Sequence, residues 1–235
     1  DIEIIQTLVD YTIERHYPEI KEDHNKPLSL LKSVIDKQAE LITHWMRVGF
    51  IHGIMNTDNM TISGETIDYG PCAFMDAYDP GTVFSSIDHT GRYAYANQPA
   101  MAQWNLARLA ETMLPLFDDE TEKATDMAEE AVNSFGAVYK EKSLSMLRAK
   151  LGLFGERVED ENLFTDLLDW MQRQDADYTN TFRDLTKKAL PKGGPYDDET
   201  FKEWYTRWQA RLAKNMEPLK SSLSLMRANN PAVIP

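Results

Sequence analysis

A polar segment from residue 50 to residue 98 interrupts a chain whose other parts carry the period of amphipathic helices. The segment is rich in Gly, Asp, Asn, Tyr and Pro, and its apolar residues come in short pieces, a pattern typical of short strands and ordered loops. A loop region of that length inside a compact domain is usually functional or disordered. Its aromatic and apolar content favours an ordered, functional segment.

Helical patterns flank this segment on both sides. The clearest is an apolar stripe that predicts one long helix over residues 28–47, with Gly49 as its stop signal. The stripe consists of Leu30, Leu31, Val34, Ile35, Gln38, Leu41, Ile42 and Trp45. Further helices are predicted at 4–16, 99–114, 120–148, 160–174, 177–190, 198–214 and 217–228. Trp104 is predicted to lie in the core, and the chain is expected to be mainly α-helical.

The composition fits a globular protein and argues against some partners. Hydrophobic residues make up 42% and charged residues 27% of the 235 residues, which is ordinary for a chain that buries a sizeable core. The net charge of -13 disfavours nucleic acid, whose phosphates repel an acidic surface. No apolar run is long enough to cross a bilayer.

The cysteine content and the ends of the chain carry two further expectations. Cys72 is the single cysteine, so no disulfide can form within the chain and a reducing compartment is favoured. The chain starts at Asp1 without an initiator Met and ends as abruptly. We therefore expect it to be a piece of a longer protein.

Oxygen-bearing side chains gather near the start of the polar segment. Asp58 and Asp68 supply carboxylates, and Asn59 supplies an amide oxygen. Such hard oxygen ligands suit Mg²⁺ or Mn²⁺, and Mg²⁺ typically takes one or two carboxylates and completes its shell with water and substrate phosphates. Gly64 is predicted to turn a small hairpin whose arms are residues 60–62 and 66–67, which would return Asp68 to the side of Asn59. Turn or cap chemistry is the alternative interpretation of these three residues.

The same stretch matches the catalytic loop of protein kinases, H-R-D-L-x-x-x-N followed by D-F-G. His52 stands at the His, Asn59 at the metal-binding Asn and Asp68 at the Asp of D-F-G. Ile54 stands where a kinase has its catalytic Asp, and it cannot accept a proton. Asp58 is the only carboxylate in this loop, so it is predicted to be the replacement base. His52 is predicted to be structural.

Longer motifs in this region strongly resemble those of the selenoprotein O family. They run from Gly49 to Met60 and from Gly64 to Pro71, and continue in residues 78–81, 88–93, 97–100 and 104–106. The resemblance implies a protein-kinase-like fold that binds ATP in an inverted orientation and transfers AMP to Ser, Thr or Tyr hydroxyls of proteins. It also implies roles for three residues: Asp58 as the proton acceptor, Asn59 and Asp68 as Mg²⁺ ligands, and Asp68 at the nucleotide as well.

The resemblance leads to a fold class and a division of the chain. We expect a mainly α, protein-kinase-like C-terminal lobe, a helical bundle with a short β-hairpin that carries the metal site. Residues 1–115 are expected to form the core with the catalytic and metal-binding loops, and residues 116–235 a helical extension packed on it. The family's N-terminal lobe and its C-terminal Cys or selenocysteine motif have no counterpart in these residues, so the isolated chain is expected to be inactive.

Two other functions stay open. One is a catalytically dead pseudokinase that acts as a protein-binding scaffold, although Asn59 and Asp68 favour an enzyme because a scaffold needs no metal ligands. The other is ordinary phosphotransfer, which Ile54 disfavours. The expected partners are ATP and protein substrates, with no nucleic acid and no membrane. The protein is expected to be a monomer, in the cytoplasm of a bacterium or the mitochondrion of a eukaryote.

Overall fold

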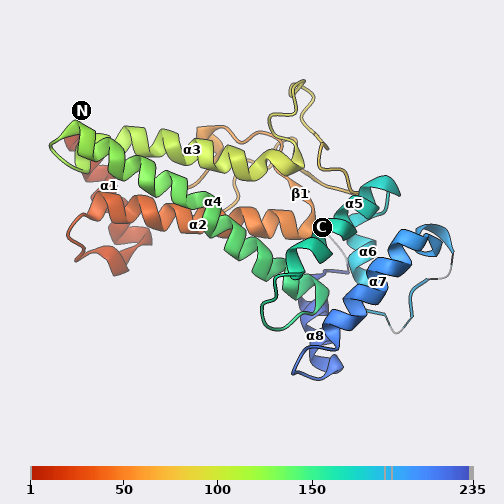
Figure 1. Ribbon diagram of the computed structural model, residues 1–235. Helices are drawn as coiled ribbons and strands as arrows, with labels where there is room; N and C mark the ends of the chain where they lie inside the picture. Colours follow the sequence, from red (N-terminus) through yellow and green to blue (C-terminus); the bar gives the residue numbers. More distant parts are fainter. Residues whose placement is uncertain (1, 188, 192, 233–235) are drawn as a thin grey trace. The chain divides into compact units, whose positions relative to one another are not determined.

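The computed structural model describes residues 2–187, 189–191 and 193–232, which are mainly helical (Figure 1). The α-helices are α1 (Ile2–His16), α2 (Lys26–Val48), α3 (Gln98–Met113), α4 (Thr121–Leu151), α5 (Asp160–Arg173), α6 (Tyr178–Asp184), α7 (Glu199–Leu212) and α8 (Leu219–Asn229). The sheet of the described part has two antiparallel strands, β1 (Phe50–Ile51) and β2 (Ala73–Phe74). The prediction of a mainly α chain is confirmed.

Most helices begin and end within three residues of their predicted limits. Gly49 follows α2 with a φ of 71°, the left-handed conformation expected of a glycine that stops a helix. The helix predicted at 177–190 was too long, since α6 ends at Asp184. Residue 188 of that range lies outside the described residues. Trp104 was wrongly assigned to the core: it is 42% exposed and turned away from the buried stripe of α3, with the Arg108 guanidinium 5.2 Å from its ring centroid.

The described chain divides into two compact units. The first comprises Asp1–Ile42, Ile54–Gly70 and Asn97–Lys140, and the second comprises Thr43–Gly53, Pro71–Ala96 and Glu141–Pro235. The predicted division at residue 115 and the kinase-like character of the lobe stay predictions. No helix within the described residues is both long enough and apolar enough to cross a membrane.

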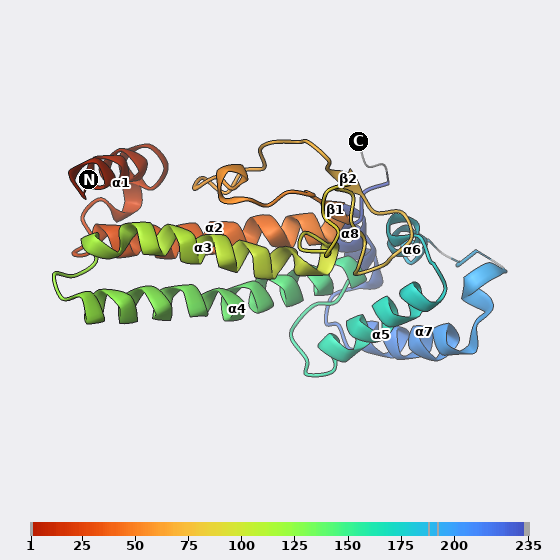
Figure 2. The same cartoon turned by 90° about the horizontal axis from the view of Figure 1, so that it is seen from above.

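The first unit is built on α2, α3 and α4, long helices that run alongside one another over the residues of this unit (Figure 2). The apolar stripe of α2 faces this core, where Leu31, Ile35 and Ile42 are buried. Gln103 of α3 donates to the carbonyl of Val132 in α4 at 3.2 Å. These contacts give the polar loop that follows Gly53 a packed helical support.

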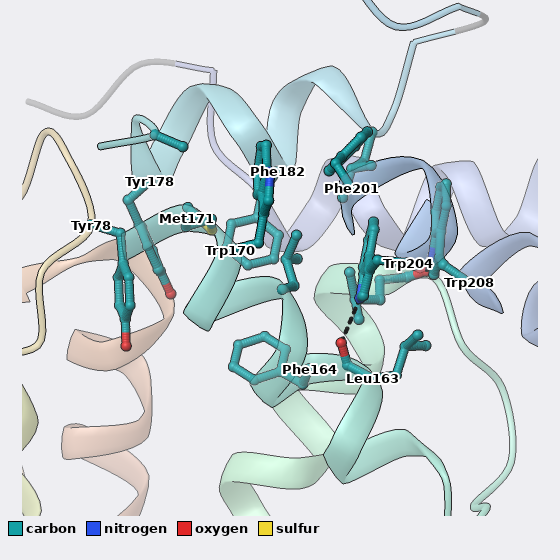
Figure 3. Packing of buried hydrophobic residues seen from close by; sticks show 14 of the residues in the cluster. Tyr78, Leu163, Phe164, Trp170, Met171, Tyr178, Phe182, Phe201, Trp204 and Trp208 are labelled. Atoms are coloured by element: carbon teal, nitrogen blue, oxygen red, sulfur yellow. Dashed lines mark hydrogen bonds between the residues drawn. The ribbon is translucent and has the colours of Figure 1, made fainter. Parts of the chain in front are cut away.

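The second unit has a core of aromatic side chains (Figure 3). The rings of Trp170 and Phe201 pack with centroids 4.5 Å apart, and Trp204 stacks on Trp208 at 5.9 Å with an interplanar angle of 7°. The indole nitrogen of Trp204 donates to the carbonyl of Leu163 at 2.6 Å. This hydrogen bond joins α7 to α5, and it satisfies a polar group that burial would otherwise leave without a partner.

Lys150, at the end of α4, is buried in the second unit. Its Nζ donates to the carbonyl of Arg47 at 2.7 Å and lies 4.0 Å from the ring centroid of Phe182 and 5.0 Å from that of Tyr178. Burial, followed by the charge of Arg47, holds the pKa of Lys150 well below its ordinary value. The folded protein therefore disfavours a proton on this amine.

Lys150 is expected to make the stability depend on pH in the alkaline range. Between the lowered pKa and the ordinary value of 10.5, the unfolded chain binds a proton that the folded chain does not. The free energy of unfolding should therefore rise with pH in this window, by up to about 1.4 kcal/mol per pH unit. Lys150→Met should remove this slope in urea titrations at pH values below 10.5. Lys123→Met, an exposed position on the same helix, is the control and should keep the slope.

Candidate metal and nucleotide site

The predicted hairpin between Asn59 and Asp68 is present in the first unit. It consists of a single antiparallel bridge between Met60 and Thr66, so the predicted arms do not extend into strands. Met60 follows Asn59 directly, and Thr66 precedes Asp68 by two residues. The structure thus brings the two candidate metal ligands to the same open end of one hairpin.

Asn59 is oriented by its own hydrogen bond. It closes the short helix η2 (Thr57–Asn59), and its Nδ2 donates to the carbonyl of Ile54 at 3.0 Å. An amide whose nitrogen is fixed on a carbonyl presents its oxygen in the other direction. The atom that Asn59 offers to a ligand is therefore the oxygen, which a cation requires.

The two carboxylates are both exposed. Asp58 lies within η2, and Asp68 has a φ of 55°, a left-handed conformation that few non-glycine residues adopt. The N–H of Gly70 donates to the carbonyl of Asp68 at 2.7 Å, which closes a tight turn just after the hairpin. Backbone strain of this kind is concentrated at ligand sites and switch regions. Both carboxylates can be reached by a bound ion or nucleotide.

The donors fit Mg²⁺ held jointly with a nucleotide better than a cation held by the protein alone. Among residues 2–187, 189–191 and 193–232, no three or more His, Cys, Asp or Glu side chains form a group that could hold a metal ion. The site offers two carboxylates and one amide oxygen, all hard donors. Mg²⁺ commonly binds through one or two carboxylates together with waters and substrate phosphates.

His52 lies in the second unit and is completely buried. Its ring stacks on Trp45, with centroids 5.2 Å apart and an interplanar angle of 24°, and meets the edge of Phe50 at 6.4 Å. A buried ring held between aromatic side chains cannot meet a substrate hydroxyl. This packing supports the structural role predicted for His52.

Two buried side-chain amides bind the backbone on either side of Asp58 and Asn59, at Met55 and Thr61. This role was not predicted from the sequence for either amide. Asn105 of α3 donates to the carbonyl of Met55 at 2.9 Å, and Gln38 of α2 donates to the carbonyl of Thr61 at 2.6 Å. Their exposed fractions are only 7% and 3%. Gln38 lies on the stripe of α2 whose other members are apolar. Its polarity on that stripe was the signal that it binds backbone rather than packing in the core.

Comparison with known proteins finds a match over the whole chain. A family model described as "Protein adenylyltransferase SelO" matches residues 1–235. A "Protein nucleotidyltransferase YdiU" of Alcanivorax borkumensis is 58% identical over 232 residues, and one of Nitrosococcus oceani is 62% identical over 231 residues. A third, of Bacillus cereus strain AH187, is 53% identical over 234 residues.

The coverage of these alignments is unequal. They include 99%, 98% and 100% of this chain but only 48%, 47% and 48% of the three relatives, in the same order. The chain spans about half the length of the curated relatives it matches.

Proposed function

Because the chain belongs to the protein adenylyltransferase SelO family, we propose that it supplies the metal-binding and proton-accepting part of a site that transfers AMP from ATP to Ser, Thr or Tyr hydroxyls of proteins. One observation carries this proposal. The hairpin bridged at Met60 and Thr66 joins Asn59, whose amide oxygen is free to bind a cation, to the exposed carboxylate of Asp68.

The reaction is a displacement at the α-phosphorus of ATP. Asp58 accepts the proton of the attacking hydroxyl, whose oxygen forms a bond to the α-phosphorus while the bond to the bridging oxygen breaks and pyrophosphate leaves. Asn59 and Asp68 would hold Mg²⁺ (or Mn²⁺), and Asp68 would also lie at the nucleotide. A bound metal ion neutralises charge on the phosphates and the leaving group.

Two alternatives make different demands on the site. A pseudokinase scaffold needs no oxygen donors at the open end of the hairpin. A kinase needs a base where Ile54 stands, and this side chain has no group that can take a proton. Both alternatives are therefore less well supported than AMP transfer. The monomeric state and the cellular location stay predictions.

Labelled ATP separates the three functions. The test protein is a chimera in which this chain replaces the matching half of the Nitrosococcus oceani relative, to which it is 62% identical. We expect label from [α-³²P]ATP, but not from [γ-³²P]ATP, to appear on a generic protein acceptor in the presence of Mg²⁺. Label from the γ position would mean kinase activity. Absence of label from both, with an active parent relative, would mean a scaffold.

The 235-residue chain alone is run in parallel and is expected to remain inactive, because the alignments with the relatives leave about half of their length uncovered. Robust labelling by the isolated chain that disappears in Asp68→Ala would overturn this part of the proposal.

A further inference from the structure

The hairpin between Asn59 and Asp68 has little strength of its own. One bridge joins Met60 and Thr66, and the N–H of Gly64 donates to the carbonyl of Thr61 at 3.3 Å. The hydroxyl of Thr61 also donates to the carbonyl of Glu65 at 2.8 Å and accepts from its N–H at 2.9 Å. Isolated two-stranded hairpins are at best marginally stable in water. The spacing of the two candidate ligands at its open end must therefore be fixed by contacts from the rest of the first unit.

Gln38 supplies the first of these contacts. It lies in the middle of α2, and its Nε2 donates to the carbonyl of Thr61, the same carbonyl that closes the turn on Gly64. Burial excludes water as an easy substitute for this donor. The carbonyl of Thr61 thus accepts one hydrogen bond from within the hairpin and one from α2, and the second ties the hairpin to the helix.

Tyr17 supplies the second contact, on the next residue of the hairpin. Its hydroxyl donates to the carbonyl of Ile62, and its ring is buried. Burial, with smaller contributions from Glu19 and Asp36, raises the pKa of Tyr17 to about 12, so the hydroxyl stays a donor even at pH 10.

The tip of the hairpin is also pressed against α2. A Cβ added at Gly64, which has a φ of 77°, would lie 2.9 Å from the Cβ of Lys37. The hairpin is thus held at two consecutive carbonyls and at its tip, all from the first 42 residues of the chain.

We propose that Gln38 and Tyr17 are positioning residues that fix the spacing of Asn59 and Asp68 through the hairpin. This inference rests on the proposed function, because the spacing matters only if the two residues share a metal ion. Mg²⁺ requires nearly ideal octahedral geometry, so a small change in the spacing weakens its binding. Outer groups that orient metal ligands typically change metal affinity about 10- to 100-fold when removed.

The test compares Gln38→Met with Gln103→Met. Both substitutions remove an amide that donates to a backbone carbonyl in the first unit, but Gln103 contacts Val132 of α4 and not the hairpin. In the chimera, Gln38→Met should raise the Mg²⁺ concentration for half-maximal AMP transfer about tenfold, while Gln103→Met leaves it unchanged. In the chain itself, without metal, Gln38→Met should speed hydrogen exchange at the amides of Gly64 and Glu65 about tenfold.

The outcomes distinguish a failure of the positioning role from a failure of the proposed AMP transfer. An unchanged Mg²⁺ requirement in an active Gln38→Met chimera, or an equal shift in Gln103→Met, overturns the positioning role. If Gln38→Met fails to fold, Tyr17→Phe, which loses only a hydroxyl, takes its place with the same expected shift. If the unsubstituted chimera does not transfer AMP, the proposed function falls. The positioning role is then decided by hydrogen exchange and by whether the affinity of the chain for Mn²⁺, measured by calorimetry, falls in Gln38→Met.

Discussion

Asp68→Ala in the chimera is expected to lower the rate of AMP transfer about a thousandfold, and added Mg²⁺ should not restore it. The substitution removes the carboxylate that is proposed both to hold the metal ion and to lie at the nucleotide, so charge on the phosphates is no longer neutralised in the transition state. The measurement is the initial rate of label transfer from [α-³²P]ATP over a range of Mg²⁺ concentrations.

Asp58→Asn should distinguish the role of the proposed base from that of the proposed metal ligands, because it should change the rate but not the Mg²⁺ requirement. Loss of a general base typically costs about 10²–10⁴ in rate. Because Asp58 is not assigned to the metal, the Mg²⁺ concentration for half-maximal rate should stay as in the parent chimera. A rate close to that of the parent would instead assign Asp58 to turn chemistry, the alternative interpretation of this loop.

Glu65→Gln is the matched control for both substitutions. Glu65 is an exposed carboxylate in the same hairpin, where it accepts a hydrogen bond from the hydroxyl of Ser63 at 2.7 Å. An amide can keep this hydrogen bond through its oxygen. The control therefore changes one charge near the site without changing a proposed ligand or base, and it should retain activity.

The helices could be predicted because their apolar stripes are long. The stripe from Leu30 to Trp45 repeats over several turns, and the predicted limits of 28–47 differ from those of α2 by two residues and one. The predicted end of α6 was wrong. The start of this helix is marked by Asp177, whose side chain accepts a hydrogen bond from the N–H of Asn180 at 2.7 Å. Its end depends on local hydrogen bonds, such as that from the Thr186 hydroxyl to the carbonyl of Arg183, which leave no periodic signal.

The short strands could not be predicted from such signals. The pairing of Phe50 with Phe74 joins two-residue strands separated by a long irregular segment. Two residues carry no recognisable alternation, and the partner is chosen by tertiary packing. The hairpin around Gly64 was predictable because a glycine lies between two short apolar pieces close together in the sequence.

The candidate base and the candidate metal ligands were predicted from the sequence, but the residues proposed to position the ligands were not. Asp58, Asn59 and Asp68 stand in a motif whose spacing predicts a base and two metal ligands. Gln38 precedes them by 20 to 30 residues on a helix, and nothing in its spacing indicates that it meets the carbonyl of Thr61. Long-range contacts to backbone atoms leave little trace in a single sequence.

The largest effect on stability is expected from Arg211 of α7. Its guanidinium binds the buried carboxylate of Asp160 through Nε at 2.6 Å and through Nη2 at 3.2 Å. It also donates to the carbonyls of Phe154 and Gly155 at 3.1 and 3.0 Å. Arg148 of α4 adds a third hydrogen bond to Asp160 at 3.0 Å. One buried ion group thus joins α4, α5, α7 and the loop between α4 and α5.

Arg211→Met is expected to lower the free energy of unfolding by about 3–5 kcal/mol. Met fills much of the same volume, but it leaves a buried carboxylate with one cationic partner in place of two and leaves two carbonyls without their donor. Arg207→Met, on the same helix, breaks an ion pair with Asp166 at 2.7 Å in which both side chains are exposed. This control should cost less than about 1 kcal/mol. Urea titrations of both variants at neutral pH give the comparison.

The pH dependence of the difference in unfolding free energy between the parent and Arg211→Met tests whether the charge of Asp160 causes it. Burial raises the pKa of Asp160, and hydrogen bonds from Arg211 and Arg148 lower it. Together the hydrogen bonds outweigh the burial, so the pKa of Asp160 lies below the ordinary value of 3.8. A carboxyl with a lowered pKa stabilises the folded state above its ordinary pKa and loses that contribution as the pH falls toward the folded value. The gap between the parent and Arg211→Met should therefore narrow below about pH 4. A gap that is independent of pH would assign the loss to packing or to the two carbonyls rather than to the charge of Asp160.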